Sequence, residues 1–403
     1  MKFIAIQTGA RHNYAIPSIL SNAGLLAEFY TDACSNVGLS KLLSLVPGFL
    51  QTPEIKNLKN RQPPNHVLQK TSVFEAPLIR FLLKKKFSSS DELKQRKLIF
   101  EFEERFGKAI LEKGFGDSTH IISMYGEEGC VYLQKAKDKG LTTITDMNIH
   151  PDVFSILRKE QELYPDIESP LPFEFLQLYK ARIENVSKVT DIFLSPSLFV
   201  EEGLLKHGID EQKCRLVPYA IDREYFNVEN QPQRGSILFV GTANLRKGVH
   251  TLGEAATLIN DQKYEFRVAG GVTQTVKKHS ITKNLRFLGR IPRSEINKEF
   301  AKADVFVLPS IAEGSAGAIY EALAVGIPVI TTKSAGSVIR DGIDGYIVPE
   351  TNPIALSERI REIVENRELR RKISEAARER AKDFTWEKYA DRFLSAIQQN
   401  NLN

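Results

Sequence analysis

The sequence has few cysteines and no long apolar run, and each shortage argues against a class of protein. Cys34, Cys130 and Cys214 lie far apart and match neither a metal-ligand spacing nor a disulfide framework, which indicates a reducing cytosol. No stretch approaches the roughly 18 apolar residues that a membrane-spanning helix needs. The apolar run at the start is too short for a signal peptide and is typical of a first strand. We therefore expect a cytoplasmic protein.

Three further absences limit the metals, cofactors and partners that we expect for this chain. The chain contains no Asp-x-Asp triplet and no His and Asp cluster with metal-ligand spacing, so we expect a site without a metal. No strand leads into G-x-G-x-x-G, which argues against an NAD-dependent dehydrogenase. The net charge of +5 is mild. It permits an anionic ligand or a membrane surface, but it gives no reason to expect a nucleic-acid partner.

The length and patterning predict an α/β protein of more than one domain. A chain of 403 residues, 42% hydrophobic and 26% charged, is typical of a globular protein with two or three domains. Strands alternate with helices, as they do around parallel sheets. The expected strands are 2–6, 120–126, 141–145, 191–197, 236–241, 264–270, 284–289, 305–310, 328–332 and 345–349. The expected helices are 248–259, 293–303, 354–366, 369–384 and one from about residue 316, whereas residues 39–106 follow a less regular pattern.

A polar stretch with Pro and Gly, residues 227–235, suits a linker between two halves. We therefore expect a first domain of residues 1–228, a second of residues 229–384, and a helix in residues 385–403 that crosses back to the first domain. Two doubly wound Rossmann-like domains would face a central cleft at the carboxyl ends of their strands, where such folds bind ligands.

The stretch EGSAGAIYEALAVGIPVI, residues 313–330, is unusual for a helix that only packs against a sheet. Small residues surround the expected helix start, where free backbone N–H groups and the positive dipole end favour a phosphate. Glu321 falls on the face opposite Ile319, Ala322 and Leu323, and it has no basic partner one turn away. It suits a carboxylate that binds a ribose diol, although a solvated glutamate is the ordinary alternative.

These segments together resemble the retaining GT-B glycosyltransferases of "group 1", the family that includes glycogen-synthase-like enzymes. Residues 313–321 resemble the E-x7-E motif of that family, and residues 239–255 its phosphate-binding strand and helix. Residues 284–310 are similar to the segment around the nucleotide base. The further matching segments are residues 336–349, after the motif helix, and residues 191–226, at the end of the first domain. The resemblance is specific from about Thr190 to Pro349 and weak before that.

The resemblance implies roles for individual residues, with a donor-binding second domain and an acceptor-side first domain. Glu313 is expected beside the donor sugar, unless it only caps the helix, and Glu321 on the ribose. Lys247 is expected to pair with the diphosphate. The family usually has an Arg where this chain has Thr242, and Arg246 is the candidate that supplies the missing charge. The other residues expected at the donor are Gly314, Ser315, Ala316, Gly317, Arg290 and Gly9.

The first domain departs further from the family. A glycine-rich loop is expected after the first strand, but TGARHNY offers only Gly9, with Arg11 and His12 as candidate contacts. A histidine commonly follows the strand at 141–145. Asp146 comes first here and His150 four residues later, so a donor-sugar contact and a structural histidine stay open as alternatives for His150.

We therefore expect a metal-independent glycosyltransferase of polysaccharide or glycolipid biosynthesis that moves a sugar from a UDP-, GDP- or ADP-linked donor to an acceptor with retention of configuration. The acceptor is a glycan, a lipid-linked molecule or a small molecule. A catalytically silent nucleotide-sugar-binding module and a nucleotide-sugar 2-epimerase are the alternatives. Residues 76–87 join an apolar stripe to Arg80, Lys84, Lys85 and Lys86. They favour either a contact with the inner face of an anionic membrane or a solvated face.

Overall fold

The computed structural model describes residues 1–45, 53–88, 91–124 and 131–398. Its backbone contacts separate into two compact units: residues 1–147 with 172–194, and residues 148–171 with 195–403. This grouping assigns residues 195–228 to the second unit, whereas the sequence suggested a boundary near residue 228. The domain boundaries and the crossing of the C-terminal helix therefore stay predictions. Cys130 and residues 399–403 lie outside the described residues.

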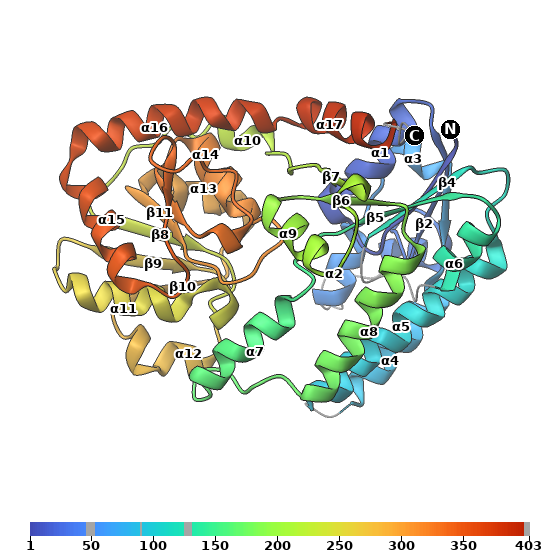
Figure 1. Ribbon diagram of the computed structural model, residues 1–403, viewed down its shortest axis with the longest axis horizontal. Helices are drawn as coiled ribbons and strands as arrows, with labels where there is room; N and C mark the ends of the chain where they lie inside the picture. Colours follow the sequence, from blue (N-terminus) through green and yellow to red (C-terminus); the bar gives the residue numbers. More distant parts are fainter. Residues whose placement is uncertain (46–52, 89–90, 125–130, 399–403) are drawn as a thin grey trace. The chain divides into compact units, whose positions relative to one another are not determined.

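Two parallel sheets organise the chain (Figure 1). The seven-stranded sheet has the order β3-β2-β1-β4-β5-β6-β7, and the six-stranded sheet the order β10-β9-β8-β11-β12-β13. The strands are β1 (Phe3–Ile6), β2 (Leu26–Thr31), β3 (Thr71–Val73), β4 (His120–Met124), β5 (Thr142–Asp146), β6 (Ile192–Ser195), β7 (Cys214–Leu216), β8 (Ser236–Val240), β9 (Glu265–Ala269), β10 (Leu285–Gly289), β11 (Val305–Leu308), β12 (Val329–Thr331) and β13 (Gly345–Ile347).

Helices accompany both sheets. Those of the first unit are α1 (Ala15–Asn22), α2 (Pro53–Lys59), α3 (Asn65–Leu68), α4 (Glu75–Lys86), α5 (Glu92–Lys113), α6 (Val131–Asp138) and α8 (Phe173–Val189). Those of the second are α7 (Val153–Leu163), α9 (Leu198–Lys206), α10 (Arg223–Phe226), α11 (Val249–Ile259), α12 (Gln274–Lys278), α13 (Arg293–Lys302), α14 (Gly317–Val325), α15 (Pro353–Glu365), α16 (Arg367–Ala381) and α17 (Trp386–Gln398).

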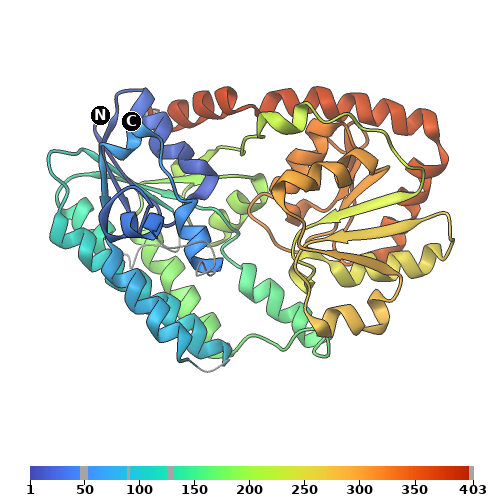
Figure 2. The same cartoon turned by 180° about the vertical axis from the view of Figure 1, so that it is seen from behind.

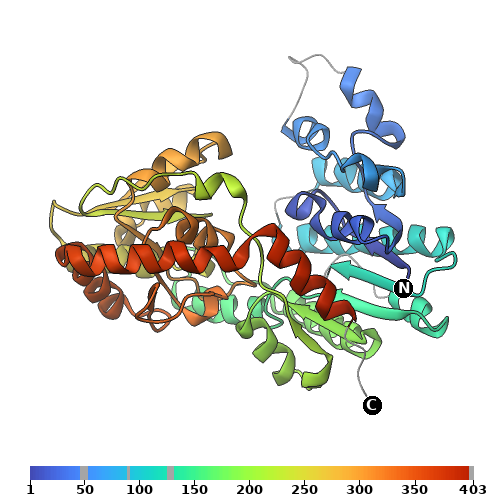
Figure 3. The same cartoon turned by 90° about the horizontal axis from the view of Figure 1, so that it is seen from above.

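The first unit shows why a parallel sheet needs cover on both faces. All four residues of β1 are buried, as expected for a strand covered on both sides. On one side α5 packs against α4, α6 and α8 (Figure 3). Phe106 and Ile110 of α5, one helical turn apart, lie in the same core cluster as Ile4 and Ile6 of β1. The Rossmann-like architecture predicted for this half is confirmed.

One expectation for this unit is wrong. Residues 39–106 contain α4 and most of α5 rather than a largely irregular segment. The sequence pattern did not indicate α5, because its apolar residues occupy a narrow stripe among many charged residues. Only Phe106, Gly107 and Ile110 of this helix are fully buried. Strands β2, β3 and β7 were also missed. Two of them, β3 and β7, have only three residues each, too short for a periodic pattern to stand out.

The second unit follows the sequence closely. Helices α11 and α15 pack together on one side of the sheet, and α13, α14 and α16 pack together on the other (Figures 1 and 2). Strands β8 and β11 are direct neighbours, with Val305 opposite Ile237 and Phe306 opposite Leu238. Parallel neighbours end at the same edge, so the turns that follow β8 and β11 are brought together there.

Candidate functional site

Two turns at the carboxyl ends of β8 and β11 build the centre of the candidate site. The first, which we call the cation turn, comprises residues 244–248 and contains a short 3-10 helix, Leu245–Lys247. The Asn244 side chain stabilises it by accepting a hydrogen bond from the Lys247 N–H at 3.0 Å. The second, which we call the glutamate loop, comprises residues 309–316 and leads into α14. The predicted cations Lys247 and Arg246 and the predicted carboxylate Glu313 therefore lie on short connections between the strands and the helices that follow them.

Backbone contacts join the two turns. The Ile311 N–H donates to the Arg246 carbonyl at 2.9 Å, and the Arg246 guanidinium donates to the Ala312 carbonyl at 3.0 Å. Gly248, with φ of 73°, passes so close to Pro309 that a Cβ would lie 2.0 Å from its carbonyl oxygen. A residue with a side chain would force the turns apart, so glycine is required here.

Glu313 lies between two cations. Its Oε1 is 2.7 Å from Nζ of Lys247, and its Oε2 is 2.7 Å from Nη1 of Arg246. All three side chains are largely removed from solvent, with exposures of 11% for Glu313, 15% for Lys247 and 23% for Arg246. The cluster carries two positive charges and one negative charge, so a net positive charge faces any anionic ligand.

The charge state of Glu313 follows from two opposing effects. Burial by itself raises the pKa of its carboxyl, but the adjacent charges of Lys247 and Arg246 and the hydrogen bonds from them outweigh burial, so its pKa is lowered. Glu313 is therefore a carboxylate at neutral pH. Its own N–H donates to the Ser334 carbonyl at 2.8 Å, which fixes the backbone at this position.

The small residues after Glu313 allow close backbone approach. A Cβ on Gly314 would lie 1.8 Å from the Asn148 carbonyl oxygen, so no side chain fits there. The Ser315 hydroxyl donates to the Gly336 carbonyl and lies 2.8 Å from the Tyr320 hydroxyl. The Ala316 N–H donates a hydrogen bond to the Ala335 carbonyl at 3.1 Å. Gly317 is exposed at the first turn of α14.

Helix α14 places Glu321 as the sequence suggested. Ile319, Ala322 and Leu323 are completely buried on the other face. The carboxyl of Glu321 accepts a hydrogen bond from the hydroxyl of Tyr225, a buried residue of α10. Burial raises the pKa of Glu321, and the hydrogen bond from Tyr225 and the charge of Arg293 oppose that rise only in part. Tyr225 had no sequence signal of its own, because a tyrosine before a linker is usually a packing residue.

Comparison with known proteins shows a family likeness in the second half of the chain. A family model described as "Glycosyl transferases group 1" matches residues 221–380, which include the cation turn, the glutamate loop and α14. Residues 221–380 are therefore similar to the group 1 glycosyl transferases. The matched residues thus include the cation turn, which carries Lys247 and Arg246, and the glutamate loop, which carries their partner Glu313.

Curated relatives share sequence similarity with slightly less than half of the chain. The chain is 34% identical over 195 residues to an uncharacterized glycosyltransferase of Methanocaldococcus jannaschii, covering 46% of this chain and 54% of that protein. It is 27% identical over 203 residues to an amylovoran biosynthesis glycosyltransferase of Erwinia amylovora, covering 45% of this chain and 49% of that protein. The chain therefore spans about half the length of the curated relatives it matches.

The fold is shared with a solved structure over the whole chain. HepE from Anabaena, in complex with UDP and glucose, has a TM-score of 0.60 at 13% identity, with 99% of this chain and 100% of that chain covered. At this identity the likeness concerns the fold alone. The expected GT-B fold class, with two Rossmann-like parallel-sheet domains, is confirmed.

The remaining residues expected in the second half lie at the surface. Thr242, directly after β8, is exposed, so the position where the family usually has an Arg is filled by a short side chain. Arg290 is also exposed, and its guanidinium lies near Gly271, where a Cβ would be 3.3 Å from Nε. Their contact with a donor stays a prediction.

His150 lies in a packed environment. Its ring is stacked on Phe199 with centroids 4.2 Å apart, and it is only 2% exposed. Its Nδ1 accepts the Asp152 N–H at 3.0 Å, and a Cβ on Gly203 would lie 2.6 Å from Nε2. Burial lowers its pKa to about 4. This geometry is the one expected of a structural histidine, and the donor-sugar contact stays a prediction.

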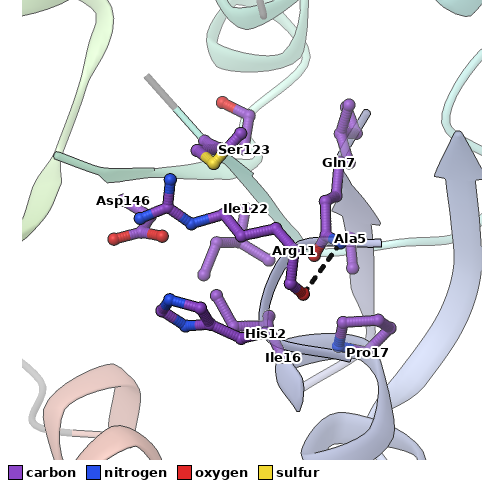
Figure 4. Close-up of a pocket in the computed structure, with 11 residues that line it drawn as sticks. Ala5, Gln7, Arg11, His12, Ile16, Pro17, Ile122, Ser123 and Asp146 are labelled. Carbon is purple, nitrogen blue, oxygen red and sulfur yellow. Dashed lines mark hydrogen bonds between the residues drawn. The ribbon is translucent and has the colours of Figure 1, made fainter. Parts of the chain in front are cut away.

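The first unit contains a separate small cavity at the carboxyl ends of β1, β4 and β5, lined by both apolar and polar side chains (Figure 4). Its volume of about 20 Å³ is near that of a single water molecule. The Arg11 guanidinium points toward the Asp146 carboxylate across it (Figure 4). Burial raises the pKa of Asp146, and the charge of Arg11 opposes that rise.

The loop beside this cavity adopts an unusual backbone. Gly9 has φ of 67°, and its N–H donates to Asp32 at 2.9 Å. His12, Asn13 and Tyr14 have φ of 47°, 51° and 61°, values that residues other than glycine seldom adopt. The loop thus takes positive φ values without the additional glycines that the family resemblance suggested.

The described residues contain neither a candidate metal site nor a membrane-spanning helix. No group of three or more His, Cys, Asp or Glu side chains in residues 1–45, 53–88, 91–124 and 131–398 is arranged to hold a metal ion. No helix within those ranges is long and apolar enough to cross a membrane.

Proposed function

We propose that the chain is a retaining glycosyltransferase that moves a sugar from a nucleotide-sugar donor to an acceptor without a metal ion. The observation that carries the proposal is the cluster of Lys247, Arg246 and Glu313, in which two turns after neighbouring strands combine two cations with one carboxylate. A site for a neutral ligand would not need two adjacent cations at the carboxyl edge of a sheet.

The chemistry follows from the charges. When the bond between the sugar and the diphosphate breaks, negative charge grows on the leaving group and must be stabilised. Lys247 and Arg246 would supply that stabilisation from fixed positions, helped by the N-terminus of α14. The Glu313 carboxylate would lie beside the sugar, where it can bind hydroxyl groups or a developing positive charge. The acceptor would attack from the face that the leaving group vacates, which retains the configuration.

The donor is a UDP-, GDP- or ADP-linked sugar, with the ribose diol bound by Glu321. HepE from Anabaena, of the same fold, was solved with UDP and glucose, which supports a nucleotide sugar in general and UDP as the first candidate. The amylovoran relative supports a glycan or lipid-linked acceptor in polysaccharide or glycolipid biosynthesis. The sparse cysteines favour the cytoplasm as the place of reaction.

A peripheral membrane contact through residues 76–87 is part of the proposal. Helix α4 exposes Ile79 and Leu83, at 44% and 57%, and Phe87 follows at 81%. These residues are four positions apart and form one stripe, beside the exposed Lys85 and Lys86. An apolar stripe bordered by cations fits an anionic lipid surface.

Vesicles test the membrane contact directly. The chain should sediment with phosphatidylglycerol vesicles and much less with phosphatidylcholine vesicles. A Leu83→Ser, Phe87→Ser double variant should lose that binding while it keeps its melting temperature. Equal sedimentation of the double variant and the unchanged chain would reject this surface.

A screen across nucleotide sugars tests the central proposal. The chain is incubated in EDTA with UDP-, GDP- and ADP-sugars, and both donor binding and release of nucleoside diphosphate are measured. Turnover of one donor, with retained configuration of the product by NMR, is the expected result. Tight binding without turnover would identify a silent module, epimerisation at C2 would identify an epimerase, and no binding at all would reject the proposal.

A further inference from the structure

The segment from α7 to Leu171 contacts the cation turn. Glu168 makes the most direct contact, because its Oε1 accepts a hydrogen bond from the Leu245 N–H at 2.7 Å. Leu245 begins the 3-10 helix that carries Arg246 and Lys247, and its side chain is completely buried. The first N–H of a helical turn has no partner within the turn, so Glu168 provides the acceptor that the turn itself lacks.

A second contact holds the first turn of α11, which directly follows the cation turn. His250, two residues after Gly248 in the first turn of α11, is completely buried, and its Nε2 lies 2.8 Å from Oε1 of Glu160 in α7. The Tyr164 ring packs on the His250 ring with centroids 4.8 Å apart. Glu160 is itself buried, with 9% exposure. A buried carboxylate needs a polar partner, so this pair ties α7 to α11.

The segment that provides both glutamates is held by its own contacts. The Leu171 N–H donates to Oε1 of the buried Gln161 at 2.9 Å, and the Glu168 N–H donates to the Tyr164 carbonyl at 3.2 Å. Asp166 reaches His279 at 2.8 Å. The chain after α7 therefore folds back on the helix. These contacts stabilise the loop that carries Glu168 and hold Glu168 beside Leu245.

We propose that Glu168 and Glu160 are positioning residues that hold Arg246 and Lys247 in place against Glu313. The inference rests on the proposed function, because it concerns the cations that would stabilise the leaving diphosphate. The cation turn is bound at its start by Glu168, and the helix that directly follows it is bound, through His250, by Glu160. The turn also contacts the glutamate loop, and loss of the Glu168 anchor removes the hydrogen bond that holds the start of the turn.

The expected consequence is a loss of rate rather than of binding. A displacement of about 1 Å in a catalytic group can lower the rate by roughly 100-fold, while a bound diphosphate tolerates a moved lysine because the attraction between charges falls only gradually with distance. We therefore expect Glu168→Ala to lower kcat by about tenfold or more, with a change of less than about threefold in the KM for the donor. Glu168→Gln should recover most of the rate, because its amide oxygen accepts the same hydrogen bond.

Glu162→Ala is the matched control. Glu162 lies on α7 between the two anchors, but it is exposed and pairs only along the helix with Arg158 at 2.8 Å. It should leave kcat and KM unchanged. A purely structural role for Glu168 would lower the melting temperature of Glu168→Ala while each folded molecule kept its full rate.

Hydrogen exchange provides a measurement that does not depend on activity. In the full chain, amide exchange at Leu245 should be at least fivefold faster in Glu168→Ala than in the unchanged chain, Glu168→Gln or Glu162→Ala. Faster exchange together with reduced kcat supports the inference. Unchanged exchange at Leu245, or faster exchange with a normal kcat, would overturn it. An unchanged chain that turns over no donor would reject the proposed function alone, and exchange at Leu245 would still decide whether the anchor exists.

Discussion

Nζ of Lys247 lies 2.7 Å from Oε1 of Glu313, although the two residues follow different strands of the six-stranded sheet. The contact exists because β8 and β11 are neighbours and parallel, so the turns at their carboxyl ends meet. Arg246 occupies the second oxygen of the same carboxylate at 2.7 Å. The predictions below follow from this cluster and from the residues around it.

Arg246→Ala should lower kcat nearly as much as the loss of Lys247 itself. Thr242 is exposed and uncharged, and Arg246 is the second cation that the structure places on Glu313. The expected loss is about 10- to 100-fold in kcat for the donor found by the screen, on the scale of one oriented electrostatic group. Steady-state kinetics measure it, with Arg371→Ala as an exposed arginine for comparison. An Arg246→Ala chain with an unchanged rate would make Arg246 a surface residue of no catalytic consequence.

Glu321→Ala should weaken donor and free nucleoside diphosphate to the same extent. If the carboxylate binds the ribose diol, its loss costs about 1–3 kcal/mol for hydrogen bonds to a charged group. Calorimetry with the free nucleoside diphosphate measures this without any turnover. Tyr225→Phe is the companion variant, since it removes the hydroxyl that donates to Glu321 and should cost less than Glu321→Ala. Unchanged affinity in a folded Glu321→Ala chain would contradict the assignment.

The buried His150 should make the fold less stable in mild acid. Burial lowers its pKa to about 4 from the ordinary 6.5, so between these values the unfolded chain binds a proton that the folded chain does not. Stability therefore falls as pH drops from 6.5 to 4, by at most about 3 kcal/mol from this residue.

The measurement for His150 is the free energy of unfolding across that pH range for the unchanged chain and for His150→Gln. The difference between the two should shrink as the pH falls. His66→Gln, which changes an exposed histidine of α3, should show no such trend. A His150→Gln chain with the same pH dependence as the unchanged chain would show that this histidine is accessible to protons in the fold.

Sugar transfer should continue in excess EDTA. In the proposed mechanism, Lys247 and Arg246, which both contact Glu313, would neutralise the diphosphate in place of a divalent ion. The rate with the chosen donor should change by less than about twofold between EDTA and added Mg²⁺ or Mn²⁺. Loss of activity in EDTA that either metal restores would mean that the cations do not suffice.

The sequence predicted the second unit well because the spacing of apolar residues along each segment agrees there with how the segments pack in the fold. Helix α14 begins at Gly317, one residue after the start expected from the run of small residues, and its buried face is the one that the spacing of Ile319, Ala322 and Leu323 indicated. Alternation of apolar strands with helices placed β8 and β11 to within a few residues. These features depend on neighbours in the chain, which a single sequence displays.

Contacts between distant segments could not be predicted in the same way. Glu160 and Glu168 are ordinary glutamates in sequence, and only the folded chain brings them to His250 and Leu245. His150 had two interpretations because nothing in its local sequence indicates the Phe199 ring that covers it. The length of α5 was also hidden, since a narrow apolar stripe among charges resembles a polar loop.

The rate of Lys247→Ala tests the central claim most directly. Charge on the leaving diphosphate grows as the glycosidic bond breaks, so Lys247 should stabilise the transition state more than the bound donor. With the donor from the screen, kcat should fall by about 100-fold or more while donor affinity falls less, and Lys247→Arg should recover part of the rate. A Lys247→Ala chain that turns over the donor at a near-normal rate would contradict the account.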